Sequence, residues 1–364
     1  MNTADFTVFV PNYNHGRYLP RSLGAIFAQS VQPREVLVVD DASTDNSVAV
    51  VEDFAKRHPV LRLVRNEKNR GVVFTMNRGV ELTRTRWLVT SAADDYVLPG
   101  FYEKSMAMLE RHPQAGLSFA NDAFQFGEHG EVQANLSGWP ERSDFYEPEG
   151  VCRYLRHTIP GHSSVYRVQA LREAGGFDPD LAWYCDWFAN LTLAFRHGAV
   201  HIPEALAVRV LLDINYSTEA KPGAKHIAVL KTFFDRIASP AWADVAPYFR
   251  KNGAPTYFGT DVIRAAATRP DLWQPHILGF LNGFTHDQYR ELLDDPEPAV
   301  RQVASFFLGP FWRKEEERKR EAEAAMAALR DELEAAKRRI PPSGAAAKFK
   351  WLAGLALQRF RKAG

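Results

Sequence analysis

The sequence predicts an α/β protein with a mostly parallel central sheet flanked by helices, followed by a helical C-terminal region. Three observations lead to this fold class. Short apolar, β-rich runs alternate with helical patterns over about the first 120 residues, and polar side chains gather just after these runs. Helical patterns separated by proline and glycine then fill residues 221–311. Alternation of strand and helix is typical of βαβ units, whose strands pair in parallel.

Local periodicity predicts each element in turn. Apolar β-rich runs predict strands over residues 6–10, 36–40, 61–65, 87–90 and 117–120. Apolar residues repeating every three or four positions predict helices over 18–30, 72–83 and 101–111, and one that carries Val48, Val51 and Phe54 behind a cap at Ser43 or Asp45. Later, 124–148 indicates loops or edge strands, whereas 166–174 and 184–196 indicate helices ended by glycine.

These patterns divide the chain into four regions. Residues 1–220 form the expected α/β domain and residues 221–311 a helical subdomain. Residues 312–340 are dense in charge and predict a helix. Residues 341–364 comprise a Pro-Pro-Ser-Gly linker and a basic amphipathic segment.

Composition excludes several classes of protein. The chain has 364 residues, of which 46% are hydrophobic and 24% charged, so it is neither collagen-like, nor disordered, nor a multi-span membrane protein. A formal net charge of +1 gives no global basic field for nucleic acid. The two cysteines, Cys152 and Cys185, form no CxxC pair. Because the N-terminus also lacks a secretory pattern, we expect a reducing, cytoplasmic location.

Polar side chains follow four of the predicted strands. Residues 11–14 follow the first, 40–45 the second, 66–71 the third and 94–95 the fourth. Ligands of open α/β sheets bind outside the carboxyl ends of the strands. We therefore expect these blocks to line a ligand site at one edge of the sheet.

Two acidic pairs within these blocks are candidates to bind a metal ion or a nucleotide. Asp94 and Asp95 repel each other unless a cation is near, and Mg²⁺ prefers one or two carboxylates together with phosphate oxygens. The alternative is a solvated turn, since Pro99-Gly100 follows. Asp40 and Asp41 offer acceptors for a nucleobase or a ribose, and the alternative is that they cap the next helix.

The order and spacing of these blocks resemble the family-2 inverting glycosyltransferases of the GT-A fold. The matching runs are Val8–Asn14, Val38–Ser47, Asn69–Gly71 with Asn77, and Ala93–Asp95; a later segment, with Ser163–Arg167, Gly175–Asp178 and Asp186, resembles the acceptor side of that family. The resemblance covers about residues 5–220. It implies transfer of a sugar from a nucleotide-diphosphate donor to a hydroxyl of a glycan or lipid-linked acceptor.

The resemblance also implies roles for individual residues. Asp41 would bind the nucleobase, with Pro11 and Tyr13 lining the same pocket. Asp94 would stand at the position that binds a divalent metal, Mg²⁺ or Mn²⁺. Many members carry one more acidic residue where this chain has Ala92, and Asp95 is the candidate to compensate for it. Arg70 is a candidate to neutralise the diphosphate, the alternative being a surface arginine.

Asp186 would be the catalytic base of this family. An inverting transfer needs a group that takes the proton from the attacking hydroxyl, and the large apolar neighbours of Asp186 would raise its pKa by desolvation. The alternative is a helix cap. His162 and Trp183 are weaker candidates for contact with acceptor or phosphates, because a lone histidine or a tryptophan near a helix is often structural. A non-catalytic sugar-nucleotide or glycan-binding module is the alternative function, which would need no buried base.

The C-terminal region predicts further contacts. Apolar residues from Ala322 to Ile340 repeat at spacings of four and three, which indicates a short coiled coil and hence a homodimer, or else a solvated helix. Residues 345–364 carry five cations, no acid, and aromatic residues including Trp351. This composition is typical of a peripheral membrane segment, which would hold the protein at the inner face of the cell membrane. The alternative is a helix that packs on its own protein.

Overall fold

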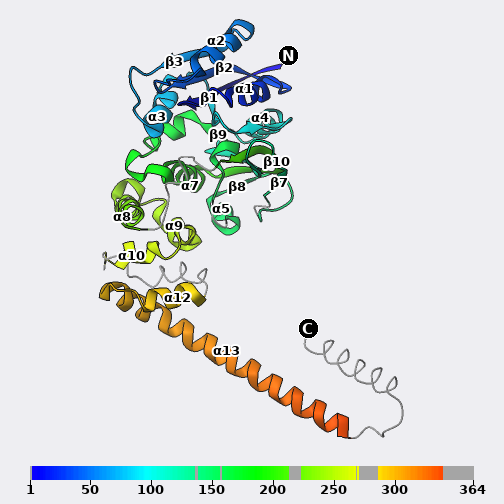
Figure 1. The fold of residues 1–364 in the computed structure, drawn as a ribbon, viewed down its shortest axis with the longest axis vertical. Helices are drawn as coiled ribbons and strands as arrows, with labels where there is room; N and C mark the ends of the chain where they lie inside the picture. The colour runs from blue at the N-terminus through cyan, green and yellow to red at the C-terminus, as the bar shows by residue number, and fades with distance from the viewer. Residues whose placement is uncertain are drawn as a thin grey trace. The chain divides into compact units, whose positions relative to one another are not determined.

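The computed structural model describes residues 2–135, 138–155, 158–212, 223–267, 269 and 286–338. The chain divides into two compact units, Met1–Ala304 and Ser305–Gly364. The predicted α/β and helical regions therefore share the first unit for most of their length (Figure 1).

A mixed sheet forms the centre of the first unit. Its strand order is β3-β2-β1-β4-β9-β6-β10-β5, with β7 paired to β6 and β8 to β10. The strands are β1 (Asn2–Asn12), β2 (Val31–Asp40), β3 (Leu61–Arg65), β4 (Trp87–Thr90), β5 (Tyr96–Val97), β6 (Leu117–Phe126), β7 (Val132–Ala134), β8 (Asp144–Tyr146), β9 (Ser164–Arg167) and β10 (Ala199–Leu211).

The direction of the strands decides where their ends meet. Strands β1, β2, β3 and β4 pair in parallel, with Val8 beside both Val36 and Val89. Strand β9 runs antiparallel between β4 and β6, so β6 points the same way as β4, and β10 pairs with β6 in parallel. The carboxyl ends of β1–β4, β6 and β10 therefore lie at one edge of the sheet. The predicted α/β class with a mostly parallel sheet is confirmed.

Helices cover the sheet and build the region after it. The helices of the first half are α1 (Leu19–Phe27), α2 (Ser47–Arg57), α3 (Val72–Leu82), α4 (Phe101–Arg111), α5 (Pro148–Tyr154) and α6 (Val168–Glu173). Those of the second half are α7 (Cys185–His197), α8 (Ala224–Ala238), α9 (Ala246–Asn252), α10 (Asp261–Ala267), α12 (His286–Leu293) and α13 (Pro298–Arg338). The 3₁₀ helices are η1 (Gly161–Ser163), η2 (Pro179–Tyr184), η4 (Pro240–Trp242) and η5 (Ala254–Phe258).

The predicted elements agree best where local pattern and packing coincide. Strands β3 and β4 and helix α4 have the predicted bounds. The helix predicted over 166–174 is wrong at its start, because Tyr166 and Arg167 belong to β9 and pair with β4 and β6. Strand β10 was missed, because Pro203 and Glu204 interrupt its apolar run and its register shifts just there.

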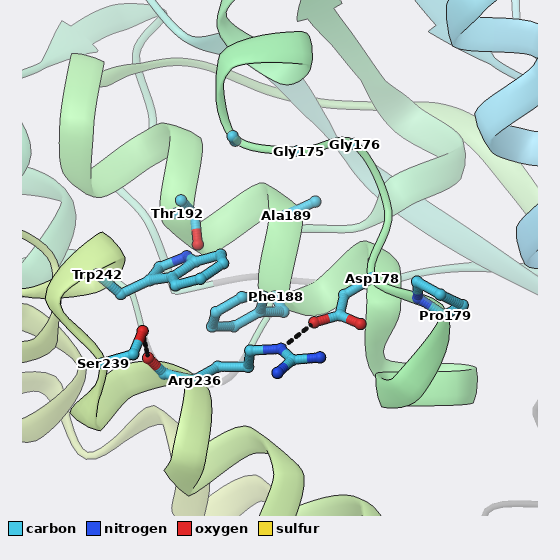
Figure 2. Close-up of a pocket in the computed structure, with 11 residues that line it drawn as sticks. Gly175, Gly176, Asp178, Pro179, Phe188, Ala189, Thr192, Arg236, Ser239 and Trp242 are labelled. Carbon is cyan, nitrogen blue, oxygen red and sulfur yellow. Dashed lines mark hydrogen bonds and ion pairs between the residues drawn. The ribbon is translucent and has the colours of Figure 1, made fainter.

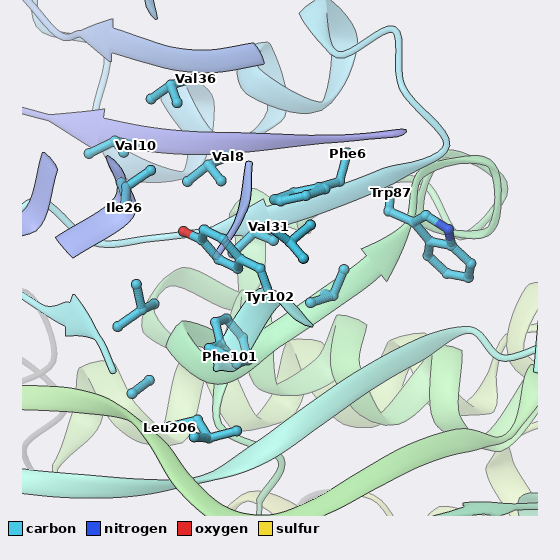
Figure 3. Packing of buried hydrophobic residues seen from close by; sticks show 14 of the residues in the cluster. Phe6, Val8, Val10, Ile26, Val31, Val36, Trp87, Phe101, Tyr102 and Leu206 are labelled. Carbon is cyan, nitrogen blue, oxygen red and sulfur yellow. The ribbon is translucent and has the colours of Figure 1, made fainter. Parts of the chain in front are cut away.

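Side chains of alternate residues on β1 fill both sides of the sheet. Phe6, Val8 and Val10 are fully buried in a cluster that includes residues of α1 and α4 (Figure 3). The rings of Phe6 and Tyr102 meet edge to face at 5.0 Å. Burying each such side chain contributes about 1.5–3 kcal/mol, so this cluster holds the helices against the strands whose ends form the site.

The opposite side of the sheet depends on a close approach by α3. Phe9 is fully buried there. A Cβ added at Gly79 would lie 2.5 Å from Cε2 of the Phe9 ring, so only glycine lets α3 come this near.

Farther along the chain, the rings of Trp187 and Phe188 on α7 pack on Phe233 of α8. This aromatic contact joins the helical region to the α/β region within the first unit.

The second unit contains most of α13, a continuous helix that begins at Pro298 rather than at 312. Met326, Leu329 and Leu333 of the predicted heptad pattern are exposed on it, with exposed fractions of 58%, 51% and 42%. The linker and the basic segment, residues 341–364, lie outside the described residues. Among the described helices, none is long and apolar enough to cross a membrane.

Replacing Gly79 tests the packing of α3 on the sheet. The Gly79→Ala variant should lower the free energy of unfolding by about 1–3 kcal/mol, because the added methyl group overpacks the Phe9 ring. The matched control is Gly24→Ala in α1, where an added Cβ meets nothing within 4 Å. There alanine should stabilise by about 0.5–1 kcal/mol. Urea unfolding of both variants measures this, and equal effects would contradict the close approach.

Candidate active site

Two loops at the carboxyl edge of the sheet hold each other through side chains. Asn12, at the end of β1, donates to Oδ1 of Asp40 at 2.8 Å and to Oγ of Ser43 at 3.1 Å. Oδ1 of Asn14 accepts from the backbone N–H of Thr44 at 2.8 Å, and Oδ2 of Asp45 from that of Gly16 at 2.9 Å. The polar residues after β1 and β2 thus hold the two loops at this edge together, and we call these hydrogen bonds the frame of the edge.

Asp41 joins this frame to the loop after β3. Its carboxylate accepts from the backbone N–H groups of Arg70 and Gly71 and, at 2.6 Å, from Nδ2 of Asn66. Gly71 has φ of 87°, in the left-handed region where glycine is unstrained. Asp41 is 3% exposed, so a nucleobase would meet a carboxylate whose acceptor sites already hold the loop in place.

The other residues predicted for the nucleotide lie around this loop and are more accessible. Tyr13 is 44% exposed and Pro11 is half-buried at the end of β1. The exposed Arg70 guanidinium lies 3.9 Å above the centroid of the Phe74 ring. This edge therefore offers an exposed aromatic ring and an exposed cation beside the buried Asp41.

Asp94 and Asp95 follow β4 and differ in their surroundings. Asp94 is half-buried, and its backbone oxygen accepts from the guanidinium of Arg21 at 2.8 Å. Asp95 is buried, and its Oδ1 accepts from the backbone N–H of Val210 on β10 at 2.8 Å. Burial and the adjacent Asp94 raise the pKa of Asp95 to about 8.

This pair suits a divalent cation that is shared with a diphosphate. In the part of the chain that the structure describes, no group of three His, Cys, Asp or Glu side chains could hold a metal ion. Mg²⁺, however, usually takes only one or two carboxylates together with substrate phosphates and water. Burial and the neighbouring Asp94 raise the pKa of Asp95, and a cation held between the two carboxyl groups would favour the loss of this proton. The donor set therefore fits the expected metal.

Asp186 lies in the first turn of α7 and is not its cap. Tyr184 occupies the cap position and makes no capping bond through its side chain. Oδ1 of Asp186 accepts from the backbone N–H of Trp187 at 2.7 Å. A Cβ added at Gly161 would lie 2.9 Å from Oδ2, so η1 passes close to the second oxygen. Burial raises the pKa of Asp186, which the Trp187 N–H and Arg209 oppose.

Arg209 and Asp122 were not predicted from the sequence. The Arg209 guanidinium on β10 lies 4.7 Å from the centroid of the Phe124 ring. Its charge lowers the pKa of Asp95, Asp122 and Asp186, each of which is raised by burial. Nε of Arg209 is buried and has no hydrogen-bond partner among the described residues. The charge of Arg209 thus acts on three carboxyl groups at this edge. Because β10 was not predicted from the sequence, no local pattern could have placed Arg209 beside them.

His162 lies against this group as a neutral ring. Its Nε2 is 3.5 Å from Oδ2 of Asp122. Burial and Arg209 lower the pKa of His162 to about 3. A histidine that stays neutral at physiological pH can accept or donate one hydrogen bond, but it supplies no charge to a phosphate.

A buried chain of hydrogen bonds supports the segment before Asp186. The hydroxyl of Tyr184 lies 2.8 Å from Nε2 of His226 in α8, whose Nδ1 lies 2.7 Å from Oδ2 of Asp261 in α10. Trp183 is 8% exposed, with the Lys225 ammonium 5.0 Å from its ring centroid. The helical region therefore anchors both aromatic residues, a role that sequence spacing could not reveal because the partners are 35 to 42 positions apart.

Backbone strain occurs in the same segment. Ala182 has φ of 47° and ψ of −121°, which is unfavourable for any residue with a Cβ. Such a conformation costs about 1–3 kcal/mol and persists only where its surroundings hold it. Here the cap at Asp178 holds the chain before Ala182, and the hydrogen bond of Tyr184 and the start of α7 hold it after Ala182.

The class of protein follows from comparison with known families. Residues 7–175 match the family model described as Glycosyl transferase family 2. This part of the chain is similar to that family, as its motifs predicted, and the fold and the relatives resemble those of glycosyltransferases.

Individual relatives agree with this class. Uncharacterized protein MT1568 of Mycobacterium tuberculosis is 26% identical over 253 residues, which are 66% of this chain and 76% of the relative. Chondroitin synthase of Escherichia coli is 23% identical over 211 residues, 58% of this chain but 29% of the synthase. The crystal structure of S. aureus TarS 1-349 in complex with UDP-GlcNAc has a TM-score of 0.59 at 16% identity, covering 85% of this chain and 92% of that one. This likeness shows the shared GT-A fold.

The buried Asp95 should make stability depend on pH. In the folded protein it keeps its proton up to about pH 8, whereas in the unfolded chain a carboxyl group ionises near pH 4. The folded state thus binds more protons between these values, so this group lowers the free energy of unfolding as the pH rises, by at most about 1.4 kcal/mol per pH unit. Asp95→Asn should flatten that slope, and Mn²⁺ should flatten it in the native protein. Urea titrations at several pH values measure both.

The exposed Asp53, on α2, supplies the control for this measurement. Asp53→Asn should leave the slope unchanged. A slope that stays the same in Asp95→Asn would contradict the raised pKa.

Proposed function

We propose that the protein is an inverting, metal-assisted glycosyltransferase that moves a sugar from a nucleoside-diphosphate donor to a hydroxyl of a glycan or lipid-linked acceptor. The observation that carries this proposal is the group of carboxylates at one edge of the sheet. Asp95 and Asp186 both have a raised pKa, and the charge of Arg209 acts on both. A module that only bound sugars would not need a second buried carboxylate with a free oxygen.

The donor would extend along this edge of the sheet. Asp41 and the exposed ring of Tyr13 are the candidates to hold the nucleobase. Arg70, together with a cation held by Asp94 and Asp95, would neutralise the diphosphate. A divalent cation held by Asp94 and Asp95 would stabilise the negative charge that develops on the leaving diphosphate. UDP and UDP-GlcNAc, which accompany the TarS structures, are the first nucleotides to try.

Asp186 would act on the acceptor. Its raised pKa makes it a stronger base than an exposed aspartate, and Oδ2 remains for the acceptor hydroxyl because Oδ1 is held by Trp187. As the hydroxyl oxygen bonds to the anomeric carbon, its proton passes to Oδ2 and the bond from that carbon to the diphosphate breaks. Attack from the side opposite the leaving group inverts the anomeric centre. Because chondroitin synthase is among the relatives, a growing polysaccharide is the acceptor we favour.

Two further contacts of the chain are proposed on sequence alone. The exposed apolar residues of α13 support a homodimer through residues 322–340. Contact of residues 345–364 with an anionic membrane concerns a segment that lies outside the described residues.

Loss of the base should separate transfer from donor binding. The Asp186→Asn variant keeps the bond from Trp187 N–H but cannot take a proton, so the rate of transfer should fall about 10²–10⁴-fold. The dissociation constant of the nucleotide should change little. Asp53→Asn is the matched control and should keep full activity. Normal turnover by Asp186→Asn would show that Asp186 is not the base.

Removing the divalent cation should weaken binding of the nucleotide. Calorimetric titration of a panel of nucleoside diphosphates with Mn²⁺, and again with EDTA, measures the difference. Because the Asp94 carboxylate would otherwise face the diphosphate without a cation between them, we expect binding to weaken at least tenfold in EDTA. Asp94→Asn should reduce the effect of Mn²⁺. Equal affinity in the Mn²⁺ and EDTA buffers would contradict a metal-binding role for Asp94 and Asp95.

A further inference from the structure

A cavity of about 330 Å³ lies on α7 away from the catalytic carboxylates. Its wall comes from the turn after α6, from η2, from α7 and from the end of α8 with η4 (Figure 2). It is lined by Ala174, Gly175, Gly176, Asp178, Pro179, Phe188, Ala189, Thr192, Arg236, Ser239 and Trp242. This volume is at the small end of the range found for ligand sites, about 300–1,000 Å³.

The cavity and Asp186 occupy different faces of α7. At 3.6 residues per turn, Phe188 and Thr192 point about 120–160° away from Asp186 around the helix axis. Asp186 faces η1 at Gly161, whereas the cavity lies against the end of α8. A molecule in the cavity would therefore be separate from the sugar being transferred.

Two aromatic rings form one side of the cavity. The rings of Phe188 and Trp242 have centroids 5.6 Å apart and planes tilted by 41°. Figure 2 shows them next to each other, below Thr192 and above Arg236. Trp242 is half-buried, so part of its ring remains accessible. Phe188 is buried beneath it, so the accessible aromatic surface comes from Trp242, and such a surface suits the C–H face of a sugar ring.

Two buried polar atoms of the wall have no partner. Oγ1 of Thr192, a residue only 1% exposed, and Nε1 of Trp242 make no hydrogen bond in the part of the chain that the structure describes. Buried polar groups are nearly always hydrogen-bonded in folded proteins, so an unpaired group indicates a partner that the described residues do not supply. A ligand with hydroxyl groups would satisfy both, since the threonine hydroxyl donates or accepts and the indole N–H donates.

The charges at the rim cancel one another. Nε of Arg236 lies 2.6 Å from Oδ2 of Asp178, and its NH2 atom lies 2.6 Å from Oδ2 of Asp180. With two carboxylates beside it, this guanidinium offers no net positive charge to a phosphate. Its remaining N–H groups and the carboxylate oxygens still offer hydrogen bonds to neutral hydroxyl groups.

We propose that this cavity binds one pyranose ring of a neutral glycan chain, at a distance from the site of transfer. The proposal rests on the proposed function, because it takes the ligand to be part of a long acceptor. A second contact of this kind raises the effective concentration of the reacting end near Asp186 without any new contact there. The cavity would thereby favour long acceptors over short ones.

Substitutions of the two residues with unpaired polar atoms test the proposal. Cellotetraose, maltotetraose and chitotetraose serve as probes. Saturation-transfer NMR and calorimetry should show binding of at least one probe to the full chain. Thr192→Val removes one unpaired hydroxyl while keeping the shape, and Trp242→Phe removes the unpaired indole N–H together with part of the ring, so that probe should bind about three- to tenfold more weakly to each variant. Because the Thr192 hydroxyl has no partner, valine should not lower the melting temperature, which separates loss of binding from loss of fold.

Thr232→Val in α8 is the matched control, since its hydroxyl makes an exposed hydrogen bond to the Ala228 carbonyl of the same helix, at 3.3 Å. It should bind the probe as the native protein does. Failure of all three probes to bind, equal binding by Thr192→Val and Thr232→Val, or displacement of the probe by uridine or adenosine would each overturn the proposal.

Titration of the same proteins with nucleoside diphosphates and Mn²⁺ distinguishes this failure from failure of the proposed function. Nucleotide binding without probe binding overturns only the glycan cavity. Probe binding that the two variants weaken, without any nucleotide binding, supports the cavity and contradicts the donor site.

Discussion

Withdrawal of carboxylates from water at one edge of the sheet is the constraint on which this structure depends. Asp40, Asp41 and Asp95 lie where strands end and Asp186 lies just after η2, and each of the four carboxyl groups accepts at least one backbone N–H. A buried carboxylate without such donors would be strongly unfavourable. The loops that supply the N–H groups are therefore held in place by the acidic residues, and the edge of the sheet becomes rigid before any ligand arrives.

The same carboxylates divide into two kinds according to how well they are compensated. Asp41 receives two backbone N–H groups and one amide side chain, and acts chiefly to hold the loop after β3. Asp95 and Asp186 receive one N–H each, share the charge of Arg209 and keep a raised pKa. In the proposed function, this incomplete compensation would suit Asp95 to a cation and Asp186 to a proton.

The helical region contributes to the site although none of its residues carries a recognisable motif. His226 and Asp261 hold the hydroxyl of Tyr184, and Phe233 and Phe258 pack on Trp187. These contacts lie on both sides of Asp186 and hold the strained backbone at Ala182. The position of Asp186 is thus set by packing from α8, η5 and α10 as much as by the sheet.

Local sequence patterns were enough to predict the α/β class, the bounds of β3, β4 and α4, and the likeness of residues 7–175 to family-2 glycosyltransferases, because strand and helix periods and strand-end motifs are local features. They placed Asp94, Asp95 and Asp186 among the candidates for the same reason. Only the tertiary structure decided that Tyr166 pairs in β9, that β10 brings Arg209 beside three carboxyl groups, and that His226 supports Tyr184. These features arise from pairing and burial between segments tens of residues apart, and their free energy depends on distances that a local pattern does not contain.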